Sequence, residues 1–470
     1  MSQSKVKSGS IIGAGDRVAP YDAMVYQDGT YTIAVDGDGN VIKKVLSSLN
    51  TDDVAIQAAI DKGNVVEFLG DFVIKNTLMI NSDNVIYYGN RSKITLANSS
   101  DVDMLSNTPP YGRNVSLHDI SFDGNKTNQS VPKDIIRLED ANSWKLHNVT
   151  IGYAGRYGFY PTTGPLVRNY VYDFDNCKFY YGNDYAIYAD VVNGLRVINS
   201  YIETNYGGIY AKGININIHH NYFDWAFGTN THHIHLVGVT ESKISNNYIM
   251  ENGVAPASGN GIFLENSFFT TITGNTIRGI KGTGIRTVIN SAGTARSNGI
   301  IVNGNSIRDC TGPAIYFSGY NPYYLSIVCA NNSMTGSAAV TVFDFGGYST
   351  GLVRNNYIRL GIVSVTTSHI MLKNNVFDSC TFNIGTYRKL VQNLGYTTES
   401  TGKDATISAG NTYVDVTHSL NDTPTTVRVT PTTNLGTRSF WVDTKGASTF
   451  RININSSDLI DHTFDWEAEV

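Results

Sequence analysis

The chain repeats a short pattern in which a polar residue is followed two places later by an apolar one. The mean spacing is about 25 residues, and a recurring period of this length is typical of repeat architectures. Uneven steps indicate that insertions are tolerated at fixed places. The pattern occurs at NVTI (148), CKF (177), SYI (200), NYF (221), NYI (247), NTI (275), NSI (305), NSM (332), NYI (356) and NVF (375).

A second pattern follows most of these segments and reads as a short strand. Its middle Ile or Val is expected to point inward while its neighbours point outward. Hairpin turn signals are rare between the segments, so we expect one coil turn per repeat, with parallel strands about 4.8 Å apart. Asn at the same bend of successive turns is expected to form a ladder of amide hydrogen bonds. The segments are AIY (186), GIY (208), HIH (233), GIF (261), GIR (284), AIY (314) and AVT (339).

The pattern changes at the N-terminal end of the repeats. Residues 49–62 (LNTDDVAIQAAIDK) predict a helix that begins at Thr51 or Asp52 and covers the open first turn. We expect strands at 65–74, 78–80 and 84–89, and a hairpin-like segment at 20–43. The expected apolar face of the helix consists of Val54, Ile56, Ala59 and Ile60.

The C-terminal part reads as a separate unit. Residues 393–404 (NLGYTTESTGKD) are polar and suggest a linker, and 405–470 contain several alternating strands typical of a small β domain. The expected organisation is therefore a head segment at 1–48, a capping helix and coil at 49–392, a linker at 393–404, and a C-terminal β-sandwich-like domain for trimerisation or receptor binding at 405–470.

Composition supports an all-β chain and argues against a nucleic-acid partner and against membrane insertion. Gly (45) and Tyr (29) are plentiful, Pro is scarce (11), and only 16% of residues are charged, with a net charge of −5. No basic cluster suggests nucleic-acid binding, no apolar run is long enough for membrane insertion, and residues 1–10 lack the apolar stretch of a signal peptide. We expect Cys177, Cys310, Cys329 and Cys380 to be small core residues rather than disulfides or metal ligands.

Two segments resemble a known superfamily. NTDDVAIQAAID followed by VVEFLGDFVI resembles the N-terminal cap of the pectate-lyase-like superfamily, and the N-x-I and G-I-x repeats resemble its right-handed parallel β-helix. The last strands, such as TVRVTP and TFRINI, look like the small domains that end viral tailspike or tail-fibre chains. The resemblance implies a β-helix of about ten or more rungs, a homotrimer, a polysaccharide ligand, and a place on a virion tail or outside the cell. The polygalacturonase and alginate-epimerase signatures are missing, so no catalytic residue can be assigned by motif.

Outward positions of successive turns would line up into a groove on the coil. Aromatic rings there can stack on sugars, and Arg or Lys can pair with uronate or sulfate groups. The alternative is an ordinary solvated surface. The expected substrate-binding residues are Tyr188, Tyr210, Lys212, Trp225, His233, Phe263, Arg278, Arg286 and Tyr316.

The histidines of THHIH (231–235) form the densest cluster of candidate catalytic or metal-binding side chains. His233 and His235 are expected on one face of a strand, two residues apart. They could act as a general acid or base, bind a metal, or have no role. We include His235 among the candidate catalytic residues.

Carboxylates that we expect in the same groove as His235 supply a second candidate. Glu203 and Asp224 occupy equivalent places on adjacent turns, about 5–6 Å apart, a separation that suits a retaining glycosidase. Glu265 is an alternative partner. No cofactor is expected, but such carboxylates could also bind Ca²⁺ in a lyase whose base is Arg286 or Lys212. The sequence thus leaves open a hydrolase, a lyase, a non-catalytic adhesin, or a structural trimer that acts as a spacer.

Overall fold

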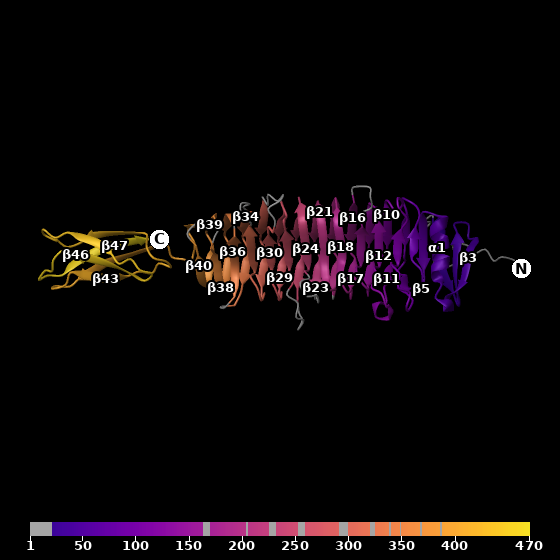
Figure 1. Ribbon diagram of the computed structural model, residues 1–470, viewed down its shortest axis with the longest axis horizontal. Helices are drawn as coiled ribbons and strands as arrows, with labels where there is room; N and C mark the ends of the chain where they lie inside the picture. The colour runs from indigo at the N-terminus through magenta and orange to yellow at the C-terminus, as the bar shows by residue number, and fades with distance from the viewer. Residues whose placement is uncertain are drawn as a thin grey trace, which may run out of the picture.

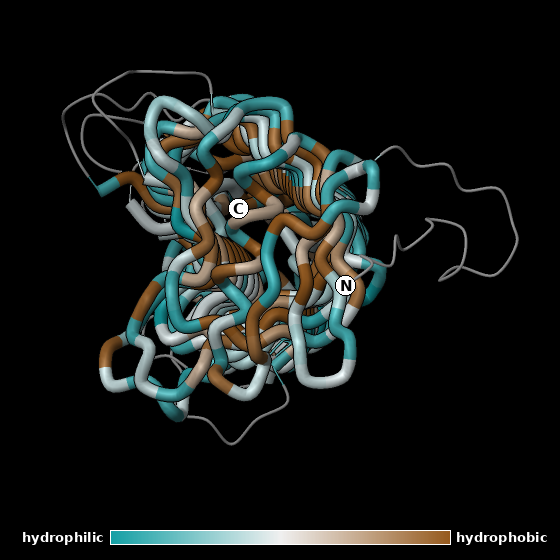
Figure 2. The backbone as a smooth tube through the Cα atoms, turned by 90° about the vertical axis from the view of Figure 1, so that its right-hand side faces the viewer, coloured by the Kyte–Doolittle hydropathy of each residue, from teal (hydrophilic) through white to brown (hydrophobic). Residues whose placement is uncertain are grey.

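The protein is described by a computed structural model that covers residues 21–162, 170–203, 205–224, 232–251, 259–290, 299–319, 325–337, 340–347, 349–366, 369–385 and 388–470. The chain forms a long rod, with a helix and three short strands at one end and a small β domain at the other (Figure 1). Viewed along the rod, successive turns of the chain superpose (Figure 2). None of the helices in the described ranges is long and apolar enough to cross a membrane.

The central part of the rod is a right-handed parallel β-helix, as expected. Most turns contribute three strands, and each strand pairs in parallel with its equivalent in the next turn, which builds three faces; the last turns contribute fewer. The first face contains β4 (Val65–Leu69), β7 (Ile86–Tyr88), β10 (Val115–His118), β13 (Trp144–His147), β16 (Val171–Asp175), β19 (Gly194–Ile198), β22 (Ile216–His219), β25 (Lys243–Ser245), β28 (Thr271–Thr273), β31 (Ile300–Asn303), β34 (Leu325–Ala330), β37 (Ser349–Arg354), β39 (His369–Lys373) and β41 (Arg388–Val391).

The second face consists of the strands that the N-x-I pattern predicts, together with earlier turns. Its strands are β5 (Asp71–Ile74), β8 (Lys93–Leu96), β11 (Ser121–Asp123), β14 (Thr150–Gly152), β17 (Lys178–Tyr180), β20 (Tyr201–Glu203), β23 (Tyr222–Asp224), β26 (Tyr248–Met250), β29 (Thr276–Arg278), β32 (Ser306–Arg308), β35 (Ser333–Thr335), β38 (Tyr357–Val365) and β40 (Val376–Ile384).

The third face consists of the strands of the second sequence pattern, and it merges with the second face at β38. Its strands are β6 (Leu78–Ile80), β9 (Leu105–Asn107), β12 (Ile136–Glu139), β15 (Phe159–Thr162), β18 (Tyr185–Val192), β21 (Gly207–Ile214), β24 (Ile234–Thr240), β27 (Ile262–Glu265), β30 (Ile285–Val288), β33 (Ile315–Gly319) and β36 (Thr341–Gly347). The first-face strands were not predicted as a set, although most carry the same inward apolar alternation, as in IxI at 216–218.

A ladder of buried asparagines holds the bend between the first and second faces. The Oδ1 atom of each Asn accepts hydrogen bonds from the backbone N–H and Nδ2 of the preceding Asn, for example Asn275 to Asn305 at 2.9 Å for both bonds. Because the amides satisfy one another, these polar side chains can be buried inside the bend. The ladder consists of Asn221, Asn247, Asn275, Asn305, Asn332, Asn356, Asn375 and Asn393.

The ladder begins one turn earlier with a serine and not with Asn148. Ser200 Oγ accepts a bond from the backbone N–H of Cys177 at 3.0 Å, and its own N–H donates to Asn221 Oδ1. Asn148 instead has a φ of 54°, a left-handed conformation that Asn tolerates well, and it lies just before the ladder position. The equivalent of the ladder residue in that turn is Val149, so our alignment of this segment was shifted by one residue.

Helix α1 (Asp52–Lys62) covers the first turn of the coil, and its polar residues bind exposed strand backbone. Asp52 Oδ2 accepts from the N–H of Val73 at 2.7 Å, and Gln57 Oε1 accepts from the N–H of Met79 at 2.8 Å. These N–H groups of β5 and β6 have no preceding turn to pair with, so α1 satisfies them. The apolar face differs from our expectation at one position, because Ala55 is buried and Val54 is 39% exposed.

At the N-terminal end of the coil, additional strands extend the first face, whereas α1 covers the strands of the other two faces. Strands β1 (Ala23–Asp28), β2 (Tyr31–Asp36) and β3 (Val41–Leu46) form an antiparallel meander, and β1 pairs in parallel with β4. The predicted hairpin-like head is therefore part of the coil's own sheet. The earlier part of the head, residues 1–20, lies outside the described residues.

We expect Asp52→Ala to lower the free energy of unfolding by about 1–3 kcal/mol, because it leaves the part-buried N–H of Val73 without an acceptor. Asp52 also accepts from Thr32 Oγ1 at 2.6 Å, which ties β2 to the helix. Urea unfolding would measure the change, and Val54→Ala on the exposed side of the same helix is the matched control. Equal losses in both variants would contradict this account of the cap.

The C-terminal domain contains two three-stranded antiparallel sheets that enclose their own small core. One contains β42 (Glu399–Ile407), β44 (Thr426–Pro431) and β47 (His462–Glu469), and the other contains β43 (Tyr413–Thr417), β45 (Phe440–Asp443) and β46 (Thr449–Ile454). The range 393–404, which we predicted as a linker, is structured: Asn393 ends the ladder, Tyr396 is buried against the last turn, and Glu399 begins β42.

Candidate functional site

The third face carries an outward row of residues that the sequence predicted correctly as vertical neighbours. Strand pairing places Tyr188 beside Tyr210, Tyr210 beside His235, and the row continues in register to Tyr316. We call it the third-face row, and it consists of Tyr188, Tyr210, His235, Phe263, Arg286 and Tyr316.

The rings in the N-terminal half of this row stack on one another. The centroids of Tyr188 and Tyr210 are 4.5 Å apart with an angle of 6° between ring planes, and Tyr157 stacks on Tyr188 at the same distance. Stacked rings present their edges to solvent, so this part of the row offers hydroxyl groups more than open ring faces. Burial raises the pKa of Tyr188 to about 12, so its hydroxyl remains protonated near neutral pH.

His235 lies in the middle of the row beside a carboxylate. Its Nε2 is 3.4 Å from Glu265 Oε2, and Glu265 Oε1 accepts a 2.7 Å hydrogen bond from Asn290. The imidazole stacks on Phe263 with centroids 4.7 Å apart. Burial lowers the pKa of His235, and the hydrogen bond to Glu265 partly opposes this shift. Asn290 and Glu265 thus orient a histidine that is neutral near neutral pH.

Arg286 supplies a positive charge two turns from His235. Its guanidinium lies 5.2 Å from the ring centroid of Phe263 and 5.5 Å from that of Tyr316. Within the described ranges of the chain it has no acidic partner, and its Nε has no hydrogen bond. A guanidinium held between two rings without a counter-ion favours an anionic ligand.

Lys212 lies two residues after Tyr210 on the same strand and already forms an ion pair. Its Nζ is 2.7 Å from Asp190 Oδ1, and it lies 5.5 Å from the ring centroid of Tyr210. The side-chain hydrogen bond to Asp190 is the main reason that the pKa of Lys212 is raised. Lys212 therefore remains a cation and is unsuited to act as the base that we considered.

Glu203, Asp224 and Arg278 lie on the second face, away from the third-face row. Glu203 and Asp224 are paired neighbours on β20 and β23, as expected, and Arg278 lies two turns further on. The structure therefore separates the four candidate catalytic residues into Glu203 with Asp224 on one face and His235 with Glu265 on the other. The reason is that the bend after β20 and β23 changes the face of the coil.

His233 lies inside the coil and not in the groove, which corrects our expectation. It is 3% exposed and packs near Phe223, because the alternation of β24 begins only at Ile234. It cannot contact a polysaccharide in this position. Trp225 lies outside the described residues.

Sequence reasoning missed several neighbours of the candidate residues. Tyr160 continues the third-face row one turn earlier, and the segment GFY (158–160) matches the GIY pattern closely enough to have revealed it. On the second face, Tyr201, Tyr222 and Tyr248 form a stacked column next to Glu203 and Asp224. That column could have been read from the repeated N/S-Y-I/F segments.

His232 and His233 together predict an acid-sensitive fold. Burial lowers the pKa of His232 to about 3 and that of His233 to about 4, and His232 Nδ1 accepts a hydrogen bond from the N–H of Asn260 at 2.9 Å. The unfolded chain, with an ordinary His pKa near 6.5, binds these protons more readily than the folded chain.

We therefore expect full stability above pH 6.5 and a loss of about 1.4 kcal/mol per pH unit for each histidine as the pH falls toward 4. Urea unfolding at pH 7.0, 5.5 and 4.5 would measure this dependence. His233→Leu should flatten it, whereas His147→Leu, at an exposed position of the first face, should not. An unchanged slope in His233→Leu would contradict this assignment.

A metal centre finds no support in the described part of the chain, where no three His, Cys, Asp or Glu side chains are arranged to hold an ion. The four cysteines are free thiols; Cys177 and Cys329 are buried, whereas Cys310 and Cys380 pack against the core but are only partly buried.

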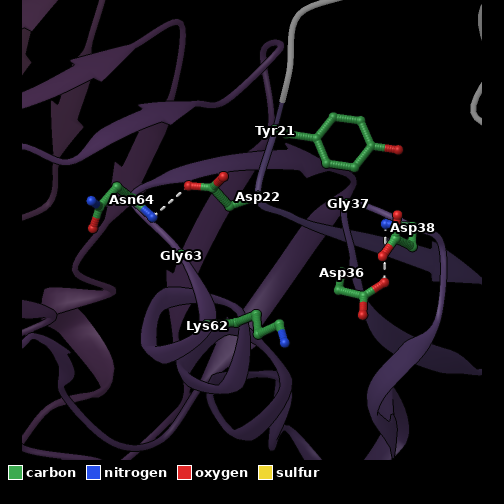
Figure 3. Close-up of a pocket in the computed structure, with 8 residues that line it drawn as sticks. All are labelled: Tyr21, Asp22, Asp36, Gly37, Asp38, Lys62, Gly63 and Asn64. Atoms are coloured by element: carbon green, nitrogen blue, oxygen red, sulfur yellow. Dashed lines mark hydrogen bonds between the residues drawn. The ribbon is translucent and has the colours of Figure 1, made fainter.

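A hollow with a volume of about 520 Å³ lies at the N-terminal end, far from the third-face row (Figure 3). Its carboxylates Asp22 and Asp36 already accept hydrogen bonds from backbone N–H groups of the chain. Asp22 Oδ2 accepts from the N–H groups of Asn64 and Val65, and Asp36 Oδ1 accepts from those of Asp38 and Asn40. The bonds of Asp22 join the segment before β1 to the start of β4, and those of Asp36 close the turn between β2 and β3. The hollow is therefore a poor candidate for a ligand site.

Comparison with known proteins supports the fold. Residues 134–298 match the family model described as the right handed beta helix region. No curated protein sequence matches the chain.

Solved structures of similar topology share little sequence with the chain. A double mutant of the tailspike protein of E. coli bacteriophage HK620 is 13% identical, with 92% of both chains covered and a TM-score of 0.45. The Dettilon tailspike protein is 13% identical over 89% of this chain and 90% of its own (TM-score 0.38). The Streptococcus pneumoniae surface protein and adhesin PfbA is 13% identical over 72% and 96% (TM-score 0.41). The likeness concerns the fold alone.

Proposed function

We propose that the third-face row binds an acidic polysaccharide of a cell surface and that His235 takes part in cleaving it. The observation that carries the proposal is the unpaired guanidinium of Arg286 two turns from the oriented His235–Glu265 pair, within one continuous row of rings. Parallel stacking repeats this row along the coil, so an extended sugar chain can contact several turns at once.

The geometry favours proton abstraction next to a uronate carboxylate. Glu265 accepts the Nε2–H of His235, which leaves the lone pair on Nδ1. Nδ1 would remove the proton from C5 of a uronate, a C4–C5 double bond would form, and the C4–O4 bond would break, with the leaving oxygen protonated by water. The ring of Phe263 lies between His235 and Arg286, so Arg286 would pair with the carboxylate of a neighbouring uronate and hold the chain in register over His235.

The proposal can be tested with oligouronates of defined length. Cleavage by elimination produces an unsaturated uronate that absorbs in the ultraviolet, together with new reducing ends. Arg286→Ala should weaken oligouronate binding by about tenfold or more, since it removes a charge-assisted contact. Arg308→Ala, an exposed arginine on the second face, is the matched control.

Each other outcome selects a different function. New reducing ends without absorbance would favour hydrolysis, for which Glu203 and Asp224 on adjacent turns are the candidates. Tight binding with unchanged chain length would favour a non-catalytic adhesin that attaches a particle to its host. Absence of binding would contradict the proposal.

We also propose that the chain assembles as a homotrimer, as part of a virion tail or another extracellular structure. The support is an outward apolar row on successive turns of the first face, in which Ile301 is 39% and Val328 is 36% exposed and which continues through Leu352 and Met371. Packing this row between copies would bury it. Light scattering should report a trimer, and Val328→Glu should dissociate it, while a monomeric unmodified chain would contradict the assignment.

A further inference from the structure

The outer surface of one sheet in the C-terminal domain displays two exposed aromatic side chains. Tyr413 is 48% and Trp441 is 46% exposed. Both pair with Asn453 of the central strand β46, one from each side, so they lie in one cross-strand row. Two strand spacings separate them, about 9.6 Å. We call this surface the distal platform.

Neighbouring side chains hold both rings. Arg451 forms a two-pronged ion pair with Asp415, with bonds of 2.7 and 2.9 Å, and its guanidinium lies 3.9 Å from the ring centroid of Tyr413. Trp441 Nε1 donates to Asp443 Oδ2 at 3.3 Å. The rings are therefore oriented in advance, which lowers the entropy lost when a ligand binds.

The other sheet of the domain has no such surface. Its outer positions hold an ion-pair group of Arg428 with Glu467 and Glu469. The structure describes every residue of 399–470. Within this range, none of the exposed large apolar side chains lies on β42, β44 or β47. The aromatic pair is thus a specific feature of one surface and does not follow from the sandwich architecture.

The platform also lies at the far end of the rod. Glu399, where the chain enters the domain, pairs with Glu469 near the C-terminus, and Figure 1 shows the C-terminus beside the coil. Tyr413 begins β43 and Trp441 lies near the start of β45, both at the opposite end of their sheet. If the rod approaches a surface with this end first, the platform would meet a ligand on that surface before the coil does.

We propose that the distal platform is a second carbohydrate-binding site, specific for a chain of neutral or amino sugars. Two rings at this spacing can stack on the C–H faces of two sugars in an extended chain, with Tyr413 using the face that Arg451 does not cover, and the carboxylates beside them can accept hydrogen bonds from hydroxyl or amino groups. Asp415 and Asp443 outnumber the single cation Arg451, so the local charge disfavours the uronates that Arg286 would attract. The site is independent of the proposed function of the coil.

The test is a titration of the full chain with cellohexaose, chitohexaose and an oligouronate of the same length, followed by calorimetry and tryptophan emission. We expect binding of a neutral or amino-sugar probe. Trp441→Ala and Tyr413→Ala should each weaken it by roughly tenfold, since each removes one stacking ring. Phe269→Ala, an exposed aromatic residue of the coil (60% exposed), is the matched control and should bind normally, as should Arg286→Ala.

Three results would overturn the proposal. The first is that neither neutral nor amino-sugar probe binds. The second is that binding is lost in Arg286→Ala but kept in Trp441→Ala, which would place the sugar on the coil. The third is that Trp441→Ala changes the oligomeric state and leaves sugar binding unaltered, which would make the platform an interface between copies of the chain. Failure of oligouronate binding to the coil would leave this test unaffected.

Discussion

Asn305→Leu is expected to destabilise the β-helix by about 4 kcal/mol although leucine has nearly the same size. Asn305 is 1% exposed, its Oδ1 accepts both the backbone N–H and the Nδ2 of Asn275, and its Nδ2 donates to the carbonyl of Ile272. Leucine leaves the N–H of Asn275 and the carbonyl of Ile272 buried without partners, and each such group costs about 1–3 kcal/mol.

Urea unfolding followed by circular dichroism would measure the Asn305→Leu change. The matched control is Asn303→Leu, two residues earlier, whose Oδ1 accepts only a surface bond from Asn331 at 2.8 Å and whose loss should cost less than about 1 kcal/mol. Similar losses for both positions would mean that the ladder contributes little beyond an ordinary surface amide.

The second large effect concerns His235. If it is the base, His235→Ala should lower the rate of polysaccharide cleavage by about 10²- to 10⁴-fold. Glu265→Gln should cause a smaller loss, because it weakens the bond that holds the proton on Nε2 while keeping the ring in place. Initial rates at saturating substrate would measure both effects, and oligouronate binding should remain in both variants because Arg286 is intact.

The pH dependence separates a base from a merely structural histidine. Burial lowers the pKa of His235, so its neutral form persists as the pH falls below 6.5, and the acid limb of the rate profile should lie below that value. His219→Ala, on the first face, should leave the rate and profile unchanged. A fully active His235→Ala variant would refute its catalytic role.

The sequence predicts those parts of the fold that repeat. Inward Ile residues and Asn at each bend recur once per turn, so the second and third faces, and the register from Tyr188 to Tyr316, follow from alignment of the repeats. The alignment fails at Asn148, where a residue that adopts a left-handed conformation is chemically identical to a ladder residue. The residue type alone does not distinguish an asparagine in the ladder from one in a left-handed conformation.

The candidate site was less predictable, because it depends on where each turn bends. His233 and His235 have the same spacing as two outward residues, yet β24 begins between them and His233 points inside. Glu203 and His235 were assigned to one groove because no residue type marks the change of face after β20. The pairing of Glu265 with Asn290 could not be foreseen either, since 25 residues separate them.

The meander at the N-terminal end has a consequence for how the rods behave in a crowded solution. A coil of parallel strands would otherwise expose a ready template at its end, onto which another rod could add without limit. Here the outermost strand of the first face is β3, which runs antiparallel to β2 and carries the exposed charges of Lys43 and Lys44. Like charges on facing rods would repel, so this strand protects the molecule from growing into fibres.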